Sequence, residues 1–127
     1  MFLDFIFKKK INRRAVSVET VKNIEREWGN INTLLSQRGP SQLRQALISA
    51  DKTLDNALRD MVEGQTMGDK LKEAEKYFDK YLYNRIWEAH KLRNNLVHES
   101  GFEPPYFTIT EAVQTFRDAL YALGVKV

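Results

Sequence analysis

Apolar residues recur along most of this chain at intervals of three and four positions, the period of an amphipathic α-helix. The first such stripe follows Ser17, a residue type that commonly caps a helix N-terminus, and Gly39-Pro40 interrupts it. A second stripe follows, for which Ser41 is the expected cap and Gly64 the expected end. The stripes consist of Val21, Ile24, Trp28, Ile31 and Leu35, and of Leu43, Ala46, Leu47, Ala50, Leu54, Ala57, Leu58 and Met61. The first half of the chain is therefore predicted to form two amphipathic helices.

A third helical stretch follows a turn at residues 64–68 and can begin at Thr66 or Asp69. No glycine or proline occurs from Asp69 to Glu99. A straight helix of this length would be unusual in a small domain. We therefore expect a bend or a break between Phe78 and Leu82, where aromatic residues crowd together.

The last predicted helix begins with the segment 108–111 (Thr-Ile-Thr-Glu), which has the pattern of a capping box, and ends at Gly124. Its apolar stripe is Ile109, Val113, Phe116, Leu120 and Leu123. Four amphipathic stretches with short links, and no convincing strand alternation, predict an all-α fold: an antiparallel four-helix bundle whose third helix is bent or split. The stripes place Leu54, Ile86, Leu96, Phe116 and Leu120 in one core.

The chain length of 127 residues fits a single domain, predicted at 17–127, preceded by a short extension at 1–16. Residues 1–14 carry five basic residues and one acid, so they hold a charge of +4 while the whole chain holds +3. Residues 15–127 therefore sum to −1. A nearly neutral body argues against a broad nucleic-acid-binding face and leaves room for a local basic patch.

The extension begins with the apolar segment 1–7, which is far too short to cross a bilayer. Its basic residues follow the apolar segment, the reverse of a secretory signal. One interpretation is that residues 1–14 make a weak contact with an anionic membrane surface or with a partner. The other is that they fold onto the body or protrude from it. We predict a cytoplasmic protein, which in the first interpretation is also peripheral to a membrane.

The chain has no cysteine and two histidines, His90 and His98. Disulfides and thiolate metal sites are thereby excluded, and a structural zinc site is not expected. No glycine-rich phosphate loop and no serine in a nucleophile-elbow setting is present. We therefore predict neither a metal nor an organic cofactor.

The segment 93–98 (Arg-Asn-Asn-Leu-Val-His) carries the most informative chemistry. Arg93 is a permanent cation that can hold a phosphate through two hydrogen bonds. The imidazole of His98 is of the side-chain type that most often transfers protons in enzymes. Asn94 can position a phosphate or fix a histidine tautomer. These three residues are the candidate catalytic set for RNA cleavage without a metal.

Projected on a helix, Arg93 falls in the middle of an apolar arc formed by Leu82, Ile86, Ala89, Leu92, Leu96 and Val97. A buried guanidinium requires an acceptor, because an unpaired buried charge is very costly. Asp51 on the second helix is the expected structural partner. Alternatively, Arg93 faces a cleft that binds phosphate. The structural pair and the phosphate cleft are compatible if Arg93 sits at the floor of the cleft and Asp51 orients it.

A second stripe runs beside this arc and comprises Tyr83, Trp87, His90, Asn94 and His98. Tyr83, Trp87 and His90 are candidate substrate-binding residues, because aromatic rings can stack on bases. They can equally be packing residues or a dimer contact, with His90 lining the bundle and bonded to the backbone.

The Arg93-Asn94 pair followed by His98 near the end of the third helix resembles the hallmark of the HEPN superfamily (higher eukaryotes and prokaryotes nucleotide-binding). The resemblance covers roughly residues 17–124 by helix order. It implies a metal-independent endoribonuclease of the toxin or defence type. In this family arginine–histidine pairs commonly meet across a homodimer, and some members pair with a nucleotidyltransferase-like antitoxin.

The same resemblance admits a catalytically silent alternative, since many HEPN members are binding or scaffold modules. Such a module would bind a nucleotide, an RNA or a protein partner. A third interpretation is a membrane-peripheral interaction protein that dimerises through its helical body and contacts the membrane through residues 1–14.

Overall fold

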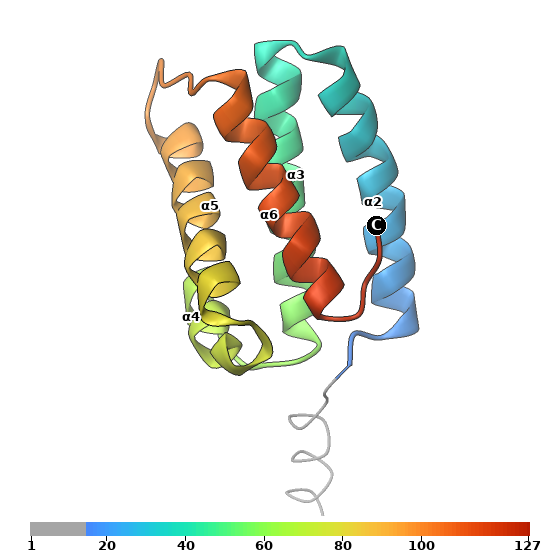
Figure 1. Cartoon of the computed structure of the whole chain (residues 1–127). Helices are drawn as coiled ribbons and strands as arrows, with labels where there is room; N and C mark the ends of the chain where they lie inside the picture. Colours follow the sequence, from blue (N-terminus) through green and yellow to red (C-terminus); the bar gives the residue numbers. More distant parts are fainter. Residues whose placement is uncertain (1–14) are drawn as a thin grey trace, which may run out of the picture.

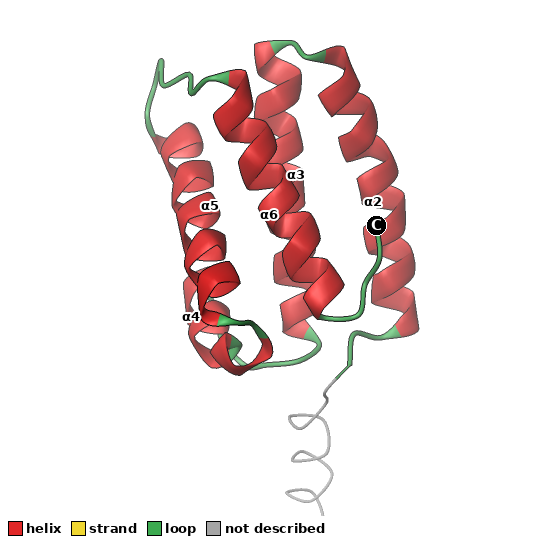
Figure 2. Cartoon of the chain, in the orientation of Figure 1, coloured by secondary structure: helices red, strands yellow, loops and turns green. Residues whose placement is uncertain are grey.

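A computed structural model describes residues 15–127, which fold into a helical bundle (Figures 1 and 2). Within this part of the chain there are five α-helices, one 3-10 helix and no strand. The elements are α2 (Val18–Gln37), α3 (Pro40–Arg59), α4 (Met67–Glu73), η1 (Glu75–Tyr77), α5 (Lys80–His98) and α6 (Tyr106–Ala122). The all-helical prediction is confirmed. The membrane contact and the alternatives predicted for residues 1–14 lie outside the described residues.

The four long helices lie side by side, with α6 across α3 and with α2 and α5 to either side (Figure 1). One hydrophobic core fills the space between them. The five core residues predicted from the stripes are all at most 1% exposed, which confirms that prediction: Leu54, Ile86, Leu96, Phe116 and Leu120. Trp28 and Ile31 of α2 belong to the same core and are 2% and 0% exposed.

The third helical stretch is broken where the aromatic residues crowd, as the sequence predicted. α4 passes into η1, Phe78 is extended, and α5 begins at Lys80. The Phe78 side chain is buried in the core, and Asp79 caps α5 by accepting a hydrogen bond from the Leu82 amide at 2.8 Å. Burial of the aromatic ring and a new N-cap together set the break. This break gives α5 an independent direction along the bundle.

Ser17 and Thr66 cap their helices as expected, by accepting hydrogen bonds from the amides three residues later. The expected cap at Ser41 is wrong, because α3 begins at Pro40 behind Gly39. Proline fits the first helical position, where its missing N–H is not needed. The helix also ends earlier than Gly64, at Arg59.

The predicted capping box at 108–111 is also wrong. α6 begins at Tyr106, and Pro105 stands before it in an extended conformation. The Thr108 amide donates to the Pro105 carbonyl at 3.0 Å, so this residue already lies inside the first turn. At the other end the prediction holds: Gly124 follows the helix with φ 88°, and the Val125 amide bonds back to the Leu120 carbonyl at 2.9 Å. Glycine adopts this left-handed conformation readily.

Candidate functional site

A groove of about 860 Å³ runs between α3 and α5 and reaches the start of α4. It collects most of the polar residues singled out in the sequence. Asp51 comes from α3, and Trp87, His90, Arg93 and Asn94 come from successive turns of α5. The i, i+3 and i+4 spacings place these α5 side chains along one side of the helix.

His90 and Asp51 form a buried polar contact in the groove. The His90 Nδ1 atom lies 2.7 Å from Asp51 Oδ2, and both side chains are buried. The predicted pair between Arg93 and Asp51 is therefore corrected, because Asp51 bonds to His90. On α5 the histidine one turn before Arg93 faces the middle of α3. His90 is consequently held by a carboxylate and not by a backbone group.

Arg93 is only partly buried and turns along the groove. Its Nη1 donates to Asn94 Oδ1 at 3.0 Å, while its buried Nε has no hydrogen-bond partner. Arg93 forms no ion pair with another described residue. The buried Nε cannot reach a ligand, but the Nη2 group makes no hydrogen bond to another described residue, so the guanidinium keeps donors for an anion, as the phosphate-cleft alternative requires.

Replacing Arg93 by methionine is expected to change the free energy of unfolding by less than about 1 kcal/mol, because it breaks no buried ion pair and keeps the aliphatic stem. Urea denaturation measures this change. A loss of about 3–5 kcal/mol, the cost of breaking a buried pair, would show that Arg93 has a buried carboxylate partner after all.

The groove is locally cationic although the body is nearly neutral. Its second carboxylate, Asp55, accepts from Lys70 at 2.7 Å and lies 3.8 Å from Arg59. Lys52 and Lys91 line the groove, are exposed, and form no ion pair with another described residue. The residues that line the groove include Lys52, Arg59, Lys91 and Arg93 against the two carboxylates, so its net charge is positive and it favours anions.

Sequence reasoning missed the basic residues of α3. Lys52, Asp55 and Arg59 follow Ile48 at intervals of three and four, so they share one face of that helix. A helical projection of the charged residues of α3 places Lys52, Asp55 and Arg59 next to Asp51, so the sequence carries this signal.

The aromatic residues of the stripe pack edge to face. The ring centres of Tyr83 and Trp87 are 6.4 Å apart, and those of Trp87 and His90 are 6.2 Å apart. Trp87 also covers Gly68, where a Cβ atom would meet the indole at 3.4 Å. Trp87 and His90 line the groove. Tyr83 contacts the Trp87 ring but does not line the groove. The ring contacts match the packing alternative, and only Trp87 and His90 can also reach a ligand there.

His98 lies apart from this groove. It is the last residue of α5, is exposed, and does not line the groove. Five helical positions separate it from Arg93, which is about 7.5 Å along the axis and roughly 140° around it. Val97, expected on the apolar arc, is 45% exposed, so within the last turn of α5 Leu96 packs in the core while Val97 faces away from it. The three candidate catalytic residues therefore do not meet within one chain.

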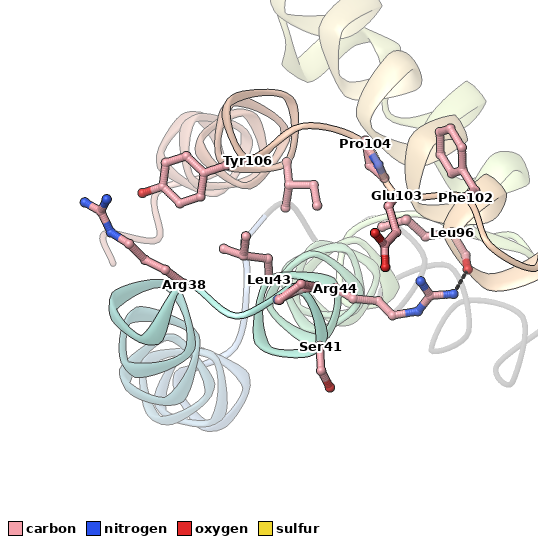
Figure 3. Close-up of a pocket in the computed structure, with 11 residues that line it drawn as sticks. Arg38, Ser41, Leu43, Arg44, Leu96, Phe102, Glu103, Pro104 and Tyr106 are labelled. Carbon is pink, nitrogen blue, oxygen red and sulfur yellow. Dashed lines mark hydrogen bonds between the residues drawn. The ribbon is translucent and has the colours of Figure 1, made fainter.

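Arg44 secures the last turn of α5. Its Nη2 donates to the Leu96 carbonyl, one of the helix-end carbonyls that lack an intrahelical partner (Figure 3). A cation at a helix C-terminus is also favourable to the helix dipole. Arg44 lines a second cavity of about 530 Å³, where Arg38 lies over the Tyr106 ring at 5.1 Å (Figure 3). This anchor positions the segment that carries His98.

Among residues 15–127 no cluster of three or more histidines, aspartates or glutamates is placed to hold a metal ion. In the same part of the chain no helix is long and apolar enough to cross a membrane. Comparison with protein-family models, with curated proteins and with solved structures finds no match to this chain.

Proposed function

We propose that this protein is a metal-independent endoribonuclease of the HEPN type, built on an antiparallel four-helix bundle. The observation that carries the proposal is the cationic groove, in which Arg93 and Asn94 lie together with His90 and in which the Nη2 group of Arg93 has no hydrogen bond to another described residue. The resemblance of the segment 93–98 to the HEPN hallmark supplies the reaction class.

In the proposed reaction, Arg93 binds the scissile phosphate and stabilises the charge that develops on it. Asn94 holds the Arg93 guanidinium through the 3.0 Å hydrogen bond. His98 transfers a proton at the ribose 2′-hydroxyl or at the leaving 5′-oxygen. The 2′-hydroxyl is the nucleophile, because it is the nearest one to the phosphorus in RNA.

A homodimer follows from the position of His98. Within one chain it does not line the groove, so the proposal requires a second protomer to bring its His98 to this groove. His98 is exposed at the end of α5, so its side chain is accessible to a second protomer. A nucleotidyltransferase-like partner and a membrane contact through residues 1–14 stay predictions of the sequence.

The test is incubation of the purified protein with RNA of mixed sequence in EDTA. We expect cleavage that leaves 2′,3′-cyclic phosphate and 5′-hydroxyl ends. DNA of the same sequence is the matched control, because it lacks the 2′-hydroxyl and should stay intact. Cleavage that needs magnesium, or equal cleavage of DNA, would contradict the proposal.

A second candidate function is a silent module that binds RNA or a nucleotide through the same groove. The distance of His98 from the groove in a single chain favours it. It predicts saturable RNA binding without cleavage, weakened by Arg93→Met and by added salt, since the contacts are to phosphates.

A further inference from the structure

A continuous line of hydrogen-bonding groups crosses the floor of the groove. Asp51 Oδ2 lies 2.7 Å from His90 Nδ1, His90 Nε2 lies 3.5 Å from Asn94 Nδ2, and Asn94 Oδ1 accepts from Arg93 Nη1 at 3.0 Å. The line begins on α3 and continues along α5. It joins a buried carboxylate to the guanidinium that faces the groove.

The chemistry of these groups gives the line a direction. Arg93 can only donate, so the Asn94 oxygen must face it and the Asn94 amide nitrogen must face His90. The Asp51 carboxylate accepts, so the proton of a neutral His90 ring sits on Nδ1. His90 Nε2 therefore carries a lone pair directed toward Asn94. The Asn94 amide nitrogen lies 3.5 Å away, at the outer limit of a hydrogen bond, so a closer donor such as a ribose 2′-hydroxyl can displace it from this groove-lining histidine.

We infer that His90 is the general base of the cleavage reaction and that Asp51 is its positioning residue. The inference rests on the proposed function and goes beyond the substrate-binding role expected for His90. A carboxylate on the far nitrogen holds an imidazole in one tautomer and stabilises the cation that forms when the near nitrogen accepts a proton. One histidine cannot serve as acid and base at once, and this assignment gives each role its own residue.

In the reaction, His90 Nε2 takes the proton of the ribose 2′-hydroxyl. The 2′-oxygen forms a bond to phosphorus, and the bond from phosphorus to the 5′-oxygen breaks. The leaving 5′-oxygen receives a proton from a protonated His98 of the second protomer. The products are a 2′,3′-cyclic phosphate and a 5′-hydroxyl, and proton exchange with water restores both imidazoles.

The two roles are separated with an RNA whose scissile 5′-oxygen is replaced by sulfur. A thiolate leaves without a proton, so this substrate needs a base but no acid. On ordinary RNA, His90→Gln and His98→Ala should each lose about 10²–10⁴-fold in rate. On the sulfur substrate His98→Ala should recover to near the wild-type rate, while His90→Gln stays defective. Wild-type rates for His90→Gln on ordinary RNA, or its recovery on the sulfur substrate, overturn the inference.

Because His90→Gln leaves the Asp51 carboxylate without its partner, the double variant Asp51→Asn/His90→Gln repeats the measurement without a stranded charge. Asp51→Asn alone offers an amide that can hold the other tautomer. We expect it to lower kcat while KM is unchanged. An increase in KM with kcat unchanged would instead show that Asp51 has only a structural role.

The tautomer is measured without any substrate. The chain has two histidines, so the imidazole nitrogen signals are assigned by comparison with His98→Ala. His90 should show the Nδ1–H tautomer when neutral, and an Nε2–H tautomer overturns the inference. A wild-type protein that cleaves neither RNA refutes the proposed function, whereas cleavage that needs His98 and not His90 refutes this inference alone.

Discussion

Replacing His98 by alanine is expected to abolish RNA cleavage, a loss of at least about 100-fold, because a positioned proton-transfer group contributes 10²–10⁴ in rate. The melting temperature should stay unchanged. His98 is exposed at the last position of α5, and its side chain makes no hydrogen bond or ion pair with another described residue. Cleavage assays in EDTA and thermal melts measure the two effects independently.

Asn95→Ala is the matched control for His98. Asn95 lies in the same final turn of α5, is also exposed, and belongs to neither the groove nor the candidate catalytic set. This variant should cleave RNA at the wild-type rate. If His98→Ala retained cleavage, or if Asn95→Ala lost it as completely, His98 would not be the catalytic histidine.

Replacing Trp28 by alanine is expected to lower the free energy of unfolding by about 3–5 kcal/mol, the usual cost of deleting a buried tryptophan side chain. The indole is 2% exposed, and its Nε1 donates to Thr53 Oγ1 at 3.0 Å. The Arg117 guanidinium lies over the ring at 4.9 Å. The substitution therefore removes core volume, a buried hydrogen bond and a cation–π contact between α2, α3 and α6.

Trp28→Phe separates these contributions in the same urea denaturation. It keeps an aromatic ring and loses the Nε1 donor, so it should cost clearly less than the alanine variant. Thr53 also donates to the Ala50 carbonyl at 2.7 Å, so its hydroxyl keeps one partner. Equal losses for the two variants would mean that the hydrogen bond, and not the buried volume, stabilises this contact.

The helices and their buried faces were predictable because each stripe repeats a local period. The residues at positions such as Ile24, Leu54 and Phe116 face inward in any bundle that buries the stripes. The break before α5 was also predictable, because a long uncapped helix is improbable in a small domain. Helix starts were less certain: Ser41 and Thr108 had suitable side chains, yet proline at Pro40 and Pro105 set the boundaries.

The sequence also determined that His90 and Asn94 share one stripe and that Arg93 lies on the arc beside it, since spacing within a helix fixes their directions. Only the tertiary structure decided that Asp51 bonds to His90 and not to Arg93. That choice depends on how α5 is rotated and shifted along α3, which no periodicity within one helix encodes. The cationic groove likewise arises where two helices meet, so the neutral composition of the body could not reveal it.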